Sequence, residues 1–392
     1  MKNKGFTLIE LLAVIVILAI IALIAIPIIL NIINDTKKEA DKRSVEMYAK
    51  AVENAVMQYQ MKEKKMPTTY KDIKDYIEYD GEEISCEEIE IYEDGKIYIK
   101  GIKNDNNTVL AKSYGTKQYK NGDIVYYDVV NGEGCTEKDY REDNSKTGYN
   151  GINGTDNQNS CLKFYAFNDD GSKKINLLLD HNTTAGIEWL TNSDYEEFVG
   201  TVPNEILNSN DCIREEICVD NSVGPITLLK QLKLDTNEWN GTLKLEARDN
   251  IDYKNYKARL ITANEIVQII RNSDKEEKIN NSLPFIYFDT VSDSVSDTCN
   301  SSNISKCKYS WLYDRTNPSC TTYGCNENSD VEINGYWTST YEASIISRSW
   351  AVAYSGVING YGLGGGVIIS RDVDDNGNGI RPVIEVLKSK VS

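Results

Sequence analysis

The chain opens with Met1-Lys-Asn-Lys-Gly5-Phe6-Thr-Leu-Ile-Glu10 and then runs from Leu11 to Leu30 without a charged side chain. About 20 helical residues at roughly 1.5 Å each span about 30 Å, which is the thickness of the hydrocarbon core of a bilayer. A cleavable secretory signal would have a shorter apolar core followed by a small-residue cleavage site, and none follows this run. The sequence therefore predicts a transmembrane helix over about 8–30 that stays attached to the protein.

Glu10 is a carboxylate at the edge of this apolar helix. A lone charge there costs roughly 2.5–3.5 kcal/mol on insertion scales, and such residues are functional by default. We therefore expect Glu10 to need a cationic partner. The competing interpretation is an ordinary signal anchor that carries an acid at the membrane interface.

The segment from Lys4 to Glu10 resembles the prepilin signature of type IV pilins and pseudopilins. The resemblance implies that residues 1–5 are a leader, that a membrane aspartyl peptidase cuts between Gly5 and Phe6, and that the new N-terminal amine is methylated. It also implies that the amine of Phe6 on a neighbouring subunit neutralises Glu10 inside the apolar bundle. Other pilin subunits and a prepilin peptidase are therefore the expected partners, together with the membrane before assembly.

The expected helix continues beyond the membrane. Pro27 lacks the N–H of a continuous helix and should kink or locally melt it. Past Asn34 the apolar residues are spaced by three and four positions among polar ones, which is typical of an amphipathic helix with one packed stripe. These residues are Val45, Tyr48, Val52, Ala55 and Tyr59. We therefore expect an N-terminal pilin helix over 6–66.

Residues 67–120 predict a short helix over 70–76 followed by a small antiparallel sheet. Apolar residues alternate over 89–99 on both sides of Asp94-Gly95, which is the strongest short-range signal for a hairpin. By the pilin resemblance, this segment is the small β-domain that packs on the helix.

Residues 121–392 predict a second, larger α+β domain of short strands, tryptophan anchors and polar loops. Its ordered motifs are Ala-Arg-Leu-Ile-Thr at 258–262, Tyr-Trp-Thr-Ser-Thr at 336–340, Trp-Ala-Val at 350–352 and Gly-Ile-Arg-Pro-Val-Ile at 379–384. This order resembles the C-type-lectin-like and formylglycine-generating-enzyme-like superfamily, and more closely the heads of large pilin-like proteins of Gram-positive bacteria. The resemblance implies a C-type-lectin-like head, and the alternative is an unrelated α+β domain.

Nine cysteines in a polar chain with a membrane signal indicate an oxidising exterior. Eight of them fall into close pairs, which we expect to form local disulfides, although eight cysteines allow many connectivities. The pairs are Cys135 with Cys161, Cys212 with Cys218, Cys299 with Cys307, and Cys320 with Cys325. Cys86 is then the odd thiol. Metal ligation is the weaker alternative, because zinc pairs usually have shorter gaps and a partner set.

The composition excludes several classes of activity. The net charge of −17 opposes extensive contact with nucleic-acid phosphates, and a single histidine removes most imidazole-based catalysis. The sequence contains no hydrolase triad and no phosphate-cradling loop, so we expect no enzymatic activity and no required cofactor. We expect His181 and Arg381 to be structural.

One metal site is a hypothesis. Asp372, Asp374 and Asn376 fit the first half of a calcium-loop pattern. Val383 stands where the second half requires a glutamate, so the pattern is not an EF-hand. A looser extracellular calcium loop remains one interpretation of these residues. The alternative is a plain acidic turn between two strands.

Together these features predict a type IV pilus (fimbrium) subunit, a minor or tip-located pilin that assembles through its N-terminal helix and displays the head for adhesion to a surface, glycan or protein. The precursor would lie in the inner (cytoplasmic) membrane and the assembled subunit in an extracellular pilus at the cell surface. The alternative is a pseudopilin of a type II secretion or DNA-uptake (competence) machine with a purely structural role, and nucleic-acid contact is expected only through such a machine. A membrane-anchored sensor or enzyme that never polymerises is the third interpretation.

Overall fold

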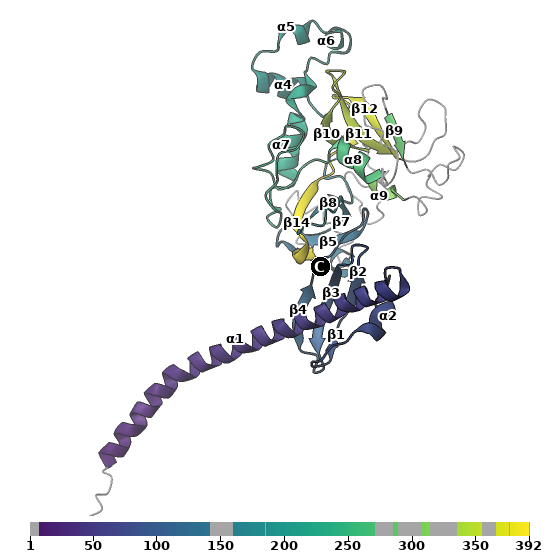
Figure 1. Ribbon diagram of the computed structural model, residues 1–392. Coiled ribbons are helices and arrows are strands. Elements are labelled where there is room, and N and C mark those ends of the chain that lie inside the picture. The colour runs from purple at the N-terminus through teal and green to yellow at the C-terminus, as the bar shows by residue number, and fades with distance from the viewer. Residues whose placement is uncertain are drawn as a thin grey trace, which may run out of the picture. The chain divides into compact units, whose positions relative to one another are not determined.

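The computed structural model divides the chain into two compact units, Met1–Lys117 (unit 1) and Gln118–Ser392 (unit 2), shown in Figure 1. The structure describes residues 8–141, 160–184, 186–270, 285–288, 308–313, 335–354, 366–375 and 377–391. The division between the units falls between Lys117 and Gln118.

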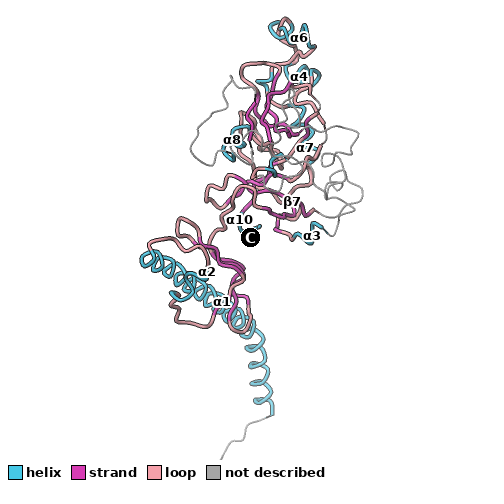
Figure 2. The backbone as a smooth tube through the Cα atoms, turned by 90° about the vertical axis from the view of Figure 1, so that its right-hand side faces the viewer, coloured by secondary structure: helices cyan, strands magenta, loops and turns pink. Residues whose placement is uncertain are grey.

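Unit 1 consists of a long helix whose C-terminal half packs on a small antiparallel sheet, as Figures 1 and 2 show. Its helices are α1 (Leu8–Glu63), α2 (Tyr70–Ile73) and the 3-10 turn η1 (Lys74–Tyr76). Its strands are β1 (Ile84–Ser85), β2 (Glu88–Ile91), β3 (Ile97–Asn104) and β4 (Val109–Tyr114). The central strand is β3, which pairs with β1 and β2 along one edge and with β4 along the other.

The hairpin predicted around Asp94-Gly95 is present as the β2–β3 pair. Ile91 faces Ile97 in the register of this pair, and Gly95 adopts a φ of +80° in the turn. Side chains disfavour that φ, so glycine is the residue that allows this tight reversal. The short helix predicted over 70–76 is also present, as α2 followed by η1.

The core of unit 1 forms between α1 and the sheet. Ala49, Val52 and Ala55 on the helix are fully buried, as are Ile99 and Ile102 on β3. Alanine at two of these helix positions lets the backbone of α1 approach the strand side chains closely. The amphipathic stripe predicted for this half of the helix is therefore its docking face.

In the part of unit 2 that the structure describes, the strands form two five-stranded sheets. One has the order β14-β8-β7-β5-β6, built from β5 (Ile124–Asp128), β6 (Glu133–Gly134), β7 (Cys161–Phe167), β8 (Lys174–Leu179) and β14 (Val383–Leu387). The other has the order β13-β10-β11-β12-β9, built from β9 (Phe285–Phe288), β10 (Gly335–Tyr341), β11 (Arg348–Tyr354), β12 (Gly366–Asp372) and β13 (Asn378–Gly379). All pairs are antiparallel except β10 with β13.

Short helices surround these sheets. They are α3 (Glu137–Arg141), α4 (Asn192–Val199), α5 (Asn204–Leu207), α6 (Asn210–Glu215), η2 (Asn221–Val223), α7 (Ile226–Asp235), α8 (Ala263–Ile270), α9 (Ser310–Tyr313) and α10 (Lys388–Val391). Amphipathic patterns in the sequence predict helices over 227–234 and 262–270, and these correspond to α7 and α8. Figures 1 and 2 place α4 and α6 at the end of unit 2 away from α10.

Residues of both sheets of unit 2 pack in one hydrophobic cluster, which includes Trp189 and Trp337. The indole N–H of Trp189 donates to the carbonyl of Thr338 at 2.9 Å, and that of Trp337 donates to the carbonyl of Ile187 at 2.7 Å. Both indoles are fully buried, so these bonds satisfy the polar atom of each ring. The mixed α and β architecture with antiparallel sheets agrees with the predicted class, whereas the C-type-lectin-like assignment of the head stays a prediction.

Candidate functional site

The N-terminal half of α1 presents apolar side chains on all sides. The exposed fractions are 60% for Leu12, 58% for Ile15, 59% for Leu18, 78% for Leu23 and 55% for Ile33. A helix that is apolar all round belongs in a bilayer or in a helical bundle. By length and composition, α1 is suited to cross a membrane.

Leaving this segment in water would be costly. Burying one leucine or isoleucine side chain is worth about 1.5–3 kcal/mol, and more than a dozen such side chains are exposed between Leu8 and Ile33. Lipid can cover them in a precursor, and the matching segments of other copies can cover them in an assembly. The exposed half of α1 is therefore the candidate functional surface of unit 1.

A polar stretch separates this surface from the docked half of the helix. Residues 34–44 are exposed or half-buried and include acids and bases on every side. Glu39 and Arg43 lie one turn apart, with Oε1 and Nε 3.7 Å from each other. The stretch fits the water-facing boundary of a membrane helix that continues into a folded domain.

The predicted processing residues Gly5 and Phe6 lie outside the described residues, so cleavage between them and methylation of Phe6 stay predictions. Glu10 lies in the first turn of α1. That position is at the N-terminal end of the apolar surface, where the predicted pairing with the amine of Phe6 on a neighbouring subunit requires a carboxylate.

The structure distinguishes the two effects predicted for Pro27. The helix α1 continues through this residue, so the proline does not melt it. Figure 1 shows α1 curved along its length rather than straight. A proline inside a helix lacks the N–H of one backbone hydrogen bond, which is a recognised cause of helix bending.

Two of the four predicted local disulfides are present in the described residues. Cys135 is bonded to Cys161 with a Cα separation of 6.0 Å, and Cys212 to Cys218 with a separation of 4.4 Å. The metal-ligand alternative is therefore wrong for Cys212 and Cys218.

The other two predicted disulfides are not among the bonds that the structure describes. Cys299 and Cys307 lie outside the described residues, so a bond between them stays a prediction. Cys320 and Cys325 also lie outside the described residues, and the same holds for the bond predicted between them.

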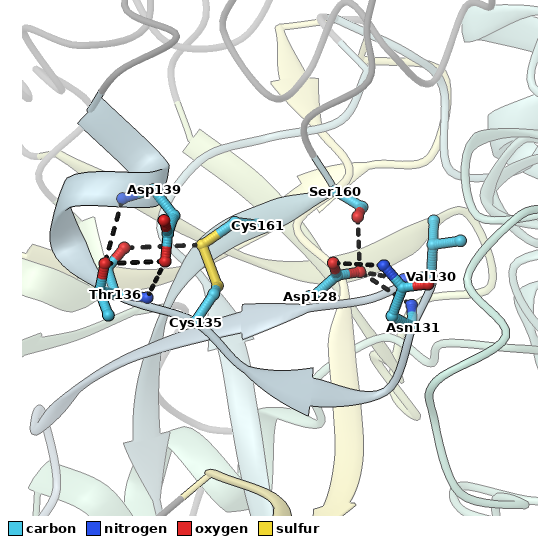
Figure 3. The surroundings of a disulfide bond; sticks show 8 residues. All are labelled: Asp128, Val130, Asn131, Cys135, Thr136, Asp139, Ser160 and Cys161. Carbon is cyan, nitrogen blue, oxygen red and sulfur yellow. Dashed lines mark hydrogen bonds between the residues drawn. A yellow bond between two sulfur atoms is a disulfide. The ribbon is translucent and has the colours of Figure 1, made fainter.

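Hydrogen bonds hold the surroundings of the Cys135–Cys161 bond, as Figure 3 shows. Thr136 and Asp139 cap α3 reciprocally: the Thr136 amide donates to Asp139 at 2.8 Å and the Asp139 amide donates to the Thr136 hydroxyl at 3.2 Å. On the neighbouring strand, Asp128 accepts from the hydroxyl of Ser160 and from the amide of Asn131. The bond thus joins two segments that are each ordered locally.

The odd thiol of Cys86 is half-buried in unit 1. Burial raises its pKa to about 11, partly opposed by a hydrogen bond with Tyr48. Because the thiolate is the reactive form, this cysteine is a poor nucleophile at neutral pH.

Arginines engage Asp372, which is one of the hypothetical calcium ligands, and Asp375, which is not. Arg348 Nε donates to Asp372 at 2.8 Å, and Arg371 lies 3.7 Å from Asp375. Burial raises the pKa of Asp374, and the carboxylates of Asp372 and Asp375 raise it further. Asn376 lies outside the described residues. Among the residues that the structure describes, no group of three or more acids, cysteines and histidines is placed to hold a metal ion.

The buried residues Arg381 and His181 have local partners. Arg381 donates to the backbone carbonyls of Leu179, Leu312 and Trp311, and its guanidinium lies 5.1 Å from the ring centre of Tyr336. These contacts connect three segments of unit 2. The imidazole of His181 hydrogen-bonds the adjacent carboxylate of Asp180.

Comparison with known proteins identifies the N-terminal segment. Residues 1–26 match the family described as the prokaryotic N-terminal methylation motif. No curated protein and no solved structure matches the chain. The motif and the apolar helix indicate a pilin-type or pseudopilin-type subunit with a membrane-anchored precursor, and they imply a prepilin peptidase and other pilin subunits as partners.

Proposed function

We propose that the chain is a minor or tip-located subunit of a type IV pilus. Its leader is removed between Gly5 and Phe6, and the mature helix leaves the cytoplasmic membrane to pack among the helices of other subunits. The observation that carries this proposal is the exposed apolar half of α1 at the end that bears the methylation motif. Elsewhere in the described residues, most large apolar side chains are already covered in the cores of the two units.

The size of unit 2 supports a minor or tip position. Unit 2 comprises more than two-thirds of the chain and follows the β-domain of unit 1 directly. A subunit repeated at close spacing along a shaft has little lateral room for such a domain. Unit 2 is then an accessory head that contacts a surface, glycan or protein outside the cell, and the C-type-lectin-like class is our proposal for its fold.

The assembly step has a direct test in the native cell. Glu10→Gln removes the charge that the amine of Phe6 is proposed to meet, and Glu63→Gln changes a matched exposed glutamate at the far end of the same helix. We expect the first variant to be processed normally but to be missing from sheared filaments. The second should be incorporated like the parent. Incorporation of Glu10→Gln at the parental level would refute the proposed role of Glu10.

The pseudopilin alternative rests on the same motif and differs in location. Immunogold labelling of intact cells separates the two proposals. Label at the ends of extracellular filaments supports the tip subunit. Absence of any labelled extracellular filament, with full processing at Phe6, favours a structural part of a secretion or DNA-uptake machine.

A further inference from the structure

A polar pocket of about 420 Å³ opens on unit 2 at the start of α8. Its volume lies within the roughly 300–1,000 Å³ range of small-molecule sites. All nine side chains that line it are polar. They come from the β7–β8 connection and β8, from Arg248 and Asp249, and from Thr262 and the first turns of α8. A ligand of this pocket must therefore be polar over most of its surface.

Two lining residues, Glu265 and Arg248, belong to a charge network with Arg259 and Glu385. Arg259 is fully buried and holds Glu265 through two bonds of 2.8 Å, one to each carboxylate oxygen. Arg248 spans Glu265 at 3.4 Å and Glu385 at 3.1 Å. Burial raises the pKa of Glu265, but the charge and hydrogen bonds of Arg259 outweigh that effect and hold the pKa below its usual value. The carboxylate of Glu265 is thus ionised and paired with arginines.

Two further lining residues, Asn176 and Asp249, are held by hydrogen bonds to side chains outside the pocket lining. Asn176 Oδ1 accepts from Arg259 Nη2 at 2.9 Å, which fixes the orientation of its amide group. Asp249 accepts from the hydroxyls of Ser339 and Thr340 at 2.9 and 2.6 Å through one oxygen, which orients the other. Asp249 has a φ of +49°, a conformation that costs energy for a residue other than glycine and persists only where the surroundings impose it.

The chemistry of the lining selects among ligand classes. Three carboxylates and one guanidinium line the pocket, so phosphate and other anions are disfavoured. Four of the lining residues, Asn168, Asn176, Asn264 and Gln268, carry amides, which have both donors and acceptors. Asn168 Nδ2 donates to Gln268 Oε1 at 3.3 Å, so this contact orients the Gln268 amide and leaves its N–H groups for a ligand. An ammonium ion only donates and would leave the amide N–H groups without partners, whereas a hydroxyl both donates and accepts. The match is to a neutral compound with many hydroxyl groups.

We infer that this pocket binds a neutral saccharide. The inference rests on the proposed role of unit 2 as an accessory head and names the class of ligand that this head contacts. Residues Asn264 and Gln268 lie one turn apart on the exposed face of α8, where their amides can bond neighbouring hydroxyls of one sugar ring.

The test uses the full chain in a detergent without a sugar head group, on an array of neutral and sialylated glycans. The double variant Asn264→Ala with Gln268→Ala removes two amides at exposed helical positions, where alanine preserves the helix. Asn237→Ala is the matched control, because Asn237 is exposed and is not part of the pocket lining. We expect binding to a subset of neutral glycans, a loss of at least about tenfold in the double variant, and no change in the control.

Three results would overturn the inference: no neutral glycan bound by the folded parent, preference for sialylated or amine-bearing probes, or equal binding by the double variant. Filament incorporation, measured in parallel, distinguishes failure of the saccharide site from failure of the proposed pilus function. A parent found in filaments without glycan binding refutes only the saccharide site. A parent that binds neutral glycans but is missing from filaments refutes the pilus proposal and retains the site.

Discussion

The buried ion pair between Lys388 and Asp169 gives the sharpest stability prediction. Lys388 Nζ lies 2.6 Å from Asp169 Oδ1, and the two side chains are 2% and 4% exposed. Asp169 also accepts from the amides of Tyr119 and Gly171 at 2.8 Å each. The pair connects α10 at the end of the chain to the turn between β7 and β8.

Methionine at position 388 has a side chain of similar length to lysine, but it leaves the buried carboxylate of Asp169 without its cation. Breaking a buried pair in this way costs about 3–5 kcal/mol. The two backbone amides still stabilise the Asp169 carboxylate, so we expect the lower end, about 3 kcal/mol. Adding Asp169→Asn removes the uncompensated charge, and the double variant should therefore recover part of the lost stability.

Urea denaturation followed by tryptophan fluorescence measures this effect, because all five tryptophans lie in unit 2. With a urea dependence of about 3 kcal/mol per M, the expected loss moves the unfolding midpoint by roughly 1 M. The control is Lys390→Met, two residues further along α10. Lys390 lies 4.0 Å from Glu133 in an exposed pair, which should contribute less than about 1 kcal/mol. Equal midpoints for Lys388→Met and Lys390→Met would refute the reasoning.

Four further measurements address other parts of the molecule. Arg381→Met leaves three buried carbonyl groups without their donor and should destabilise unit 2 by about 3 kcal/mol in the same urea assay; an unchanged midpoint would contradict the structural role. Replacing Cys212 and Cys218 with serine should lower the stability of unit 2 by about 2–4 kcal/mol, seen as a lower melting temperature than that of the oxidised parent. Because burial raises the pKa of Cys86 to about 11, maleimide should label the folded chain slowly at pH 8 and quickly in urea, and rapid labelling of the folded chain at pH 8 would contradict this. The stability contributed by the neutral thiol should be lost as the pH rises from about 9 through 11. Thermal melting of the full chain in millimolar calcium tests the hypothetical calcium loop at Asp372: a rise in melting temperature would support the site, and the absence of any shift would exclude it.

Local sequence signals were sufficient for the elements that depend on near neighbours. The β2–β3 hairpin follows from Asp94-Gly95, and α8 follows from an apolar pattern that begins after Thr262. The structure adds the reason for that start: Thr262 and Glu265 form a capping box, with two bonds of 3.0 Å. The docked half of α1 was predictable because its stripe has a helical period.

Elements without a periodic apolar pattern, and strand pairings between segments far apart in the sequence, were not predictable. The helices α4, α5 and α6 are too short to show a clear amphipathic pattern. Thr191 and Ser209 cap α4 and α6, and such residues are equally common in the loops of this chain. The pairing of β9 with β12 joins residues 285–288 to 366–369, and no local spacing rule connects those segments.

The candidate sites differ in the same way. The apolar half of α1 was predictable because its motif and apolar run are contiguous in the sequence. The polar pocket was missed because its lining comes from three separated segments, 168–176, 248–249 and 262–268. Single asparagines and a glutamine in a chain rich in such residues give no signal until the fold brings them together.

The Cys135–Cys161 bond has a practical consequence for handling the protein. The two sulfurs join β7 to the strand end that precedes α3, so a protease that cuts once between positions 142 and 159 cannot release either fragment. The nicked material would migrate as one band on an electrophoresis gel until a reductant is added. Preparations judged intact without reductant can therefore contain cleaved molecules.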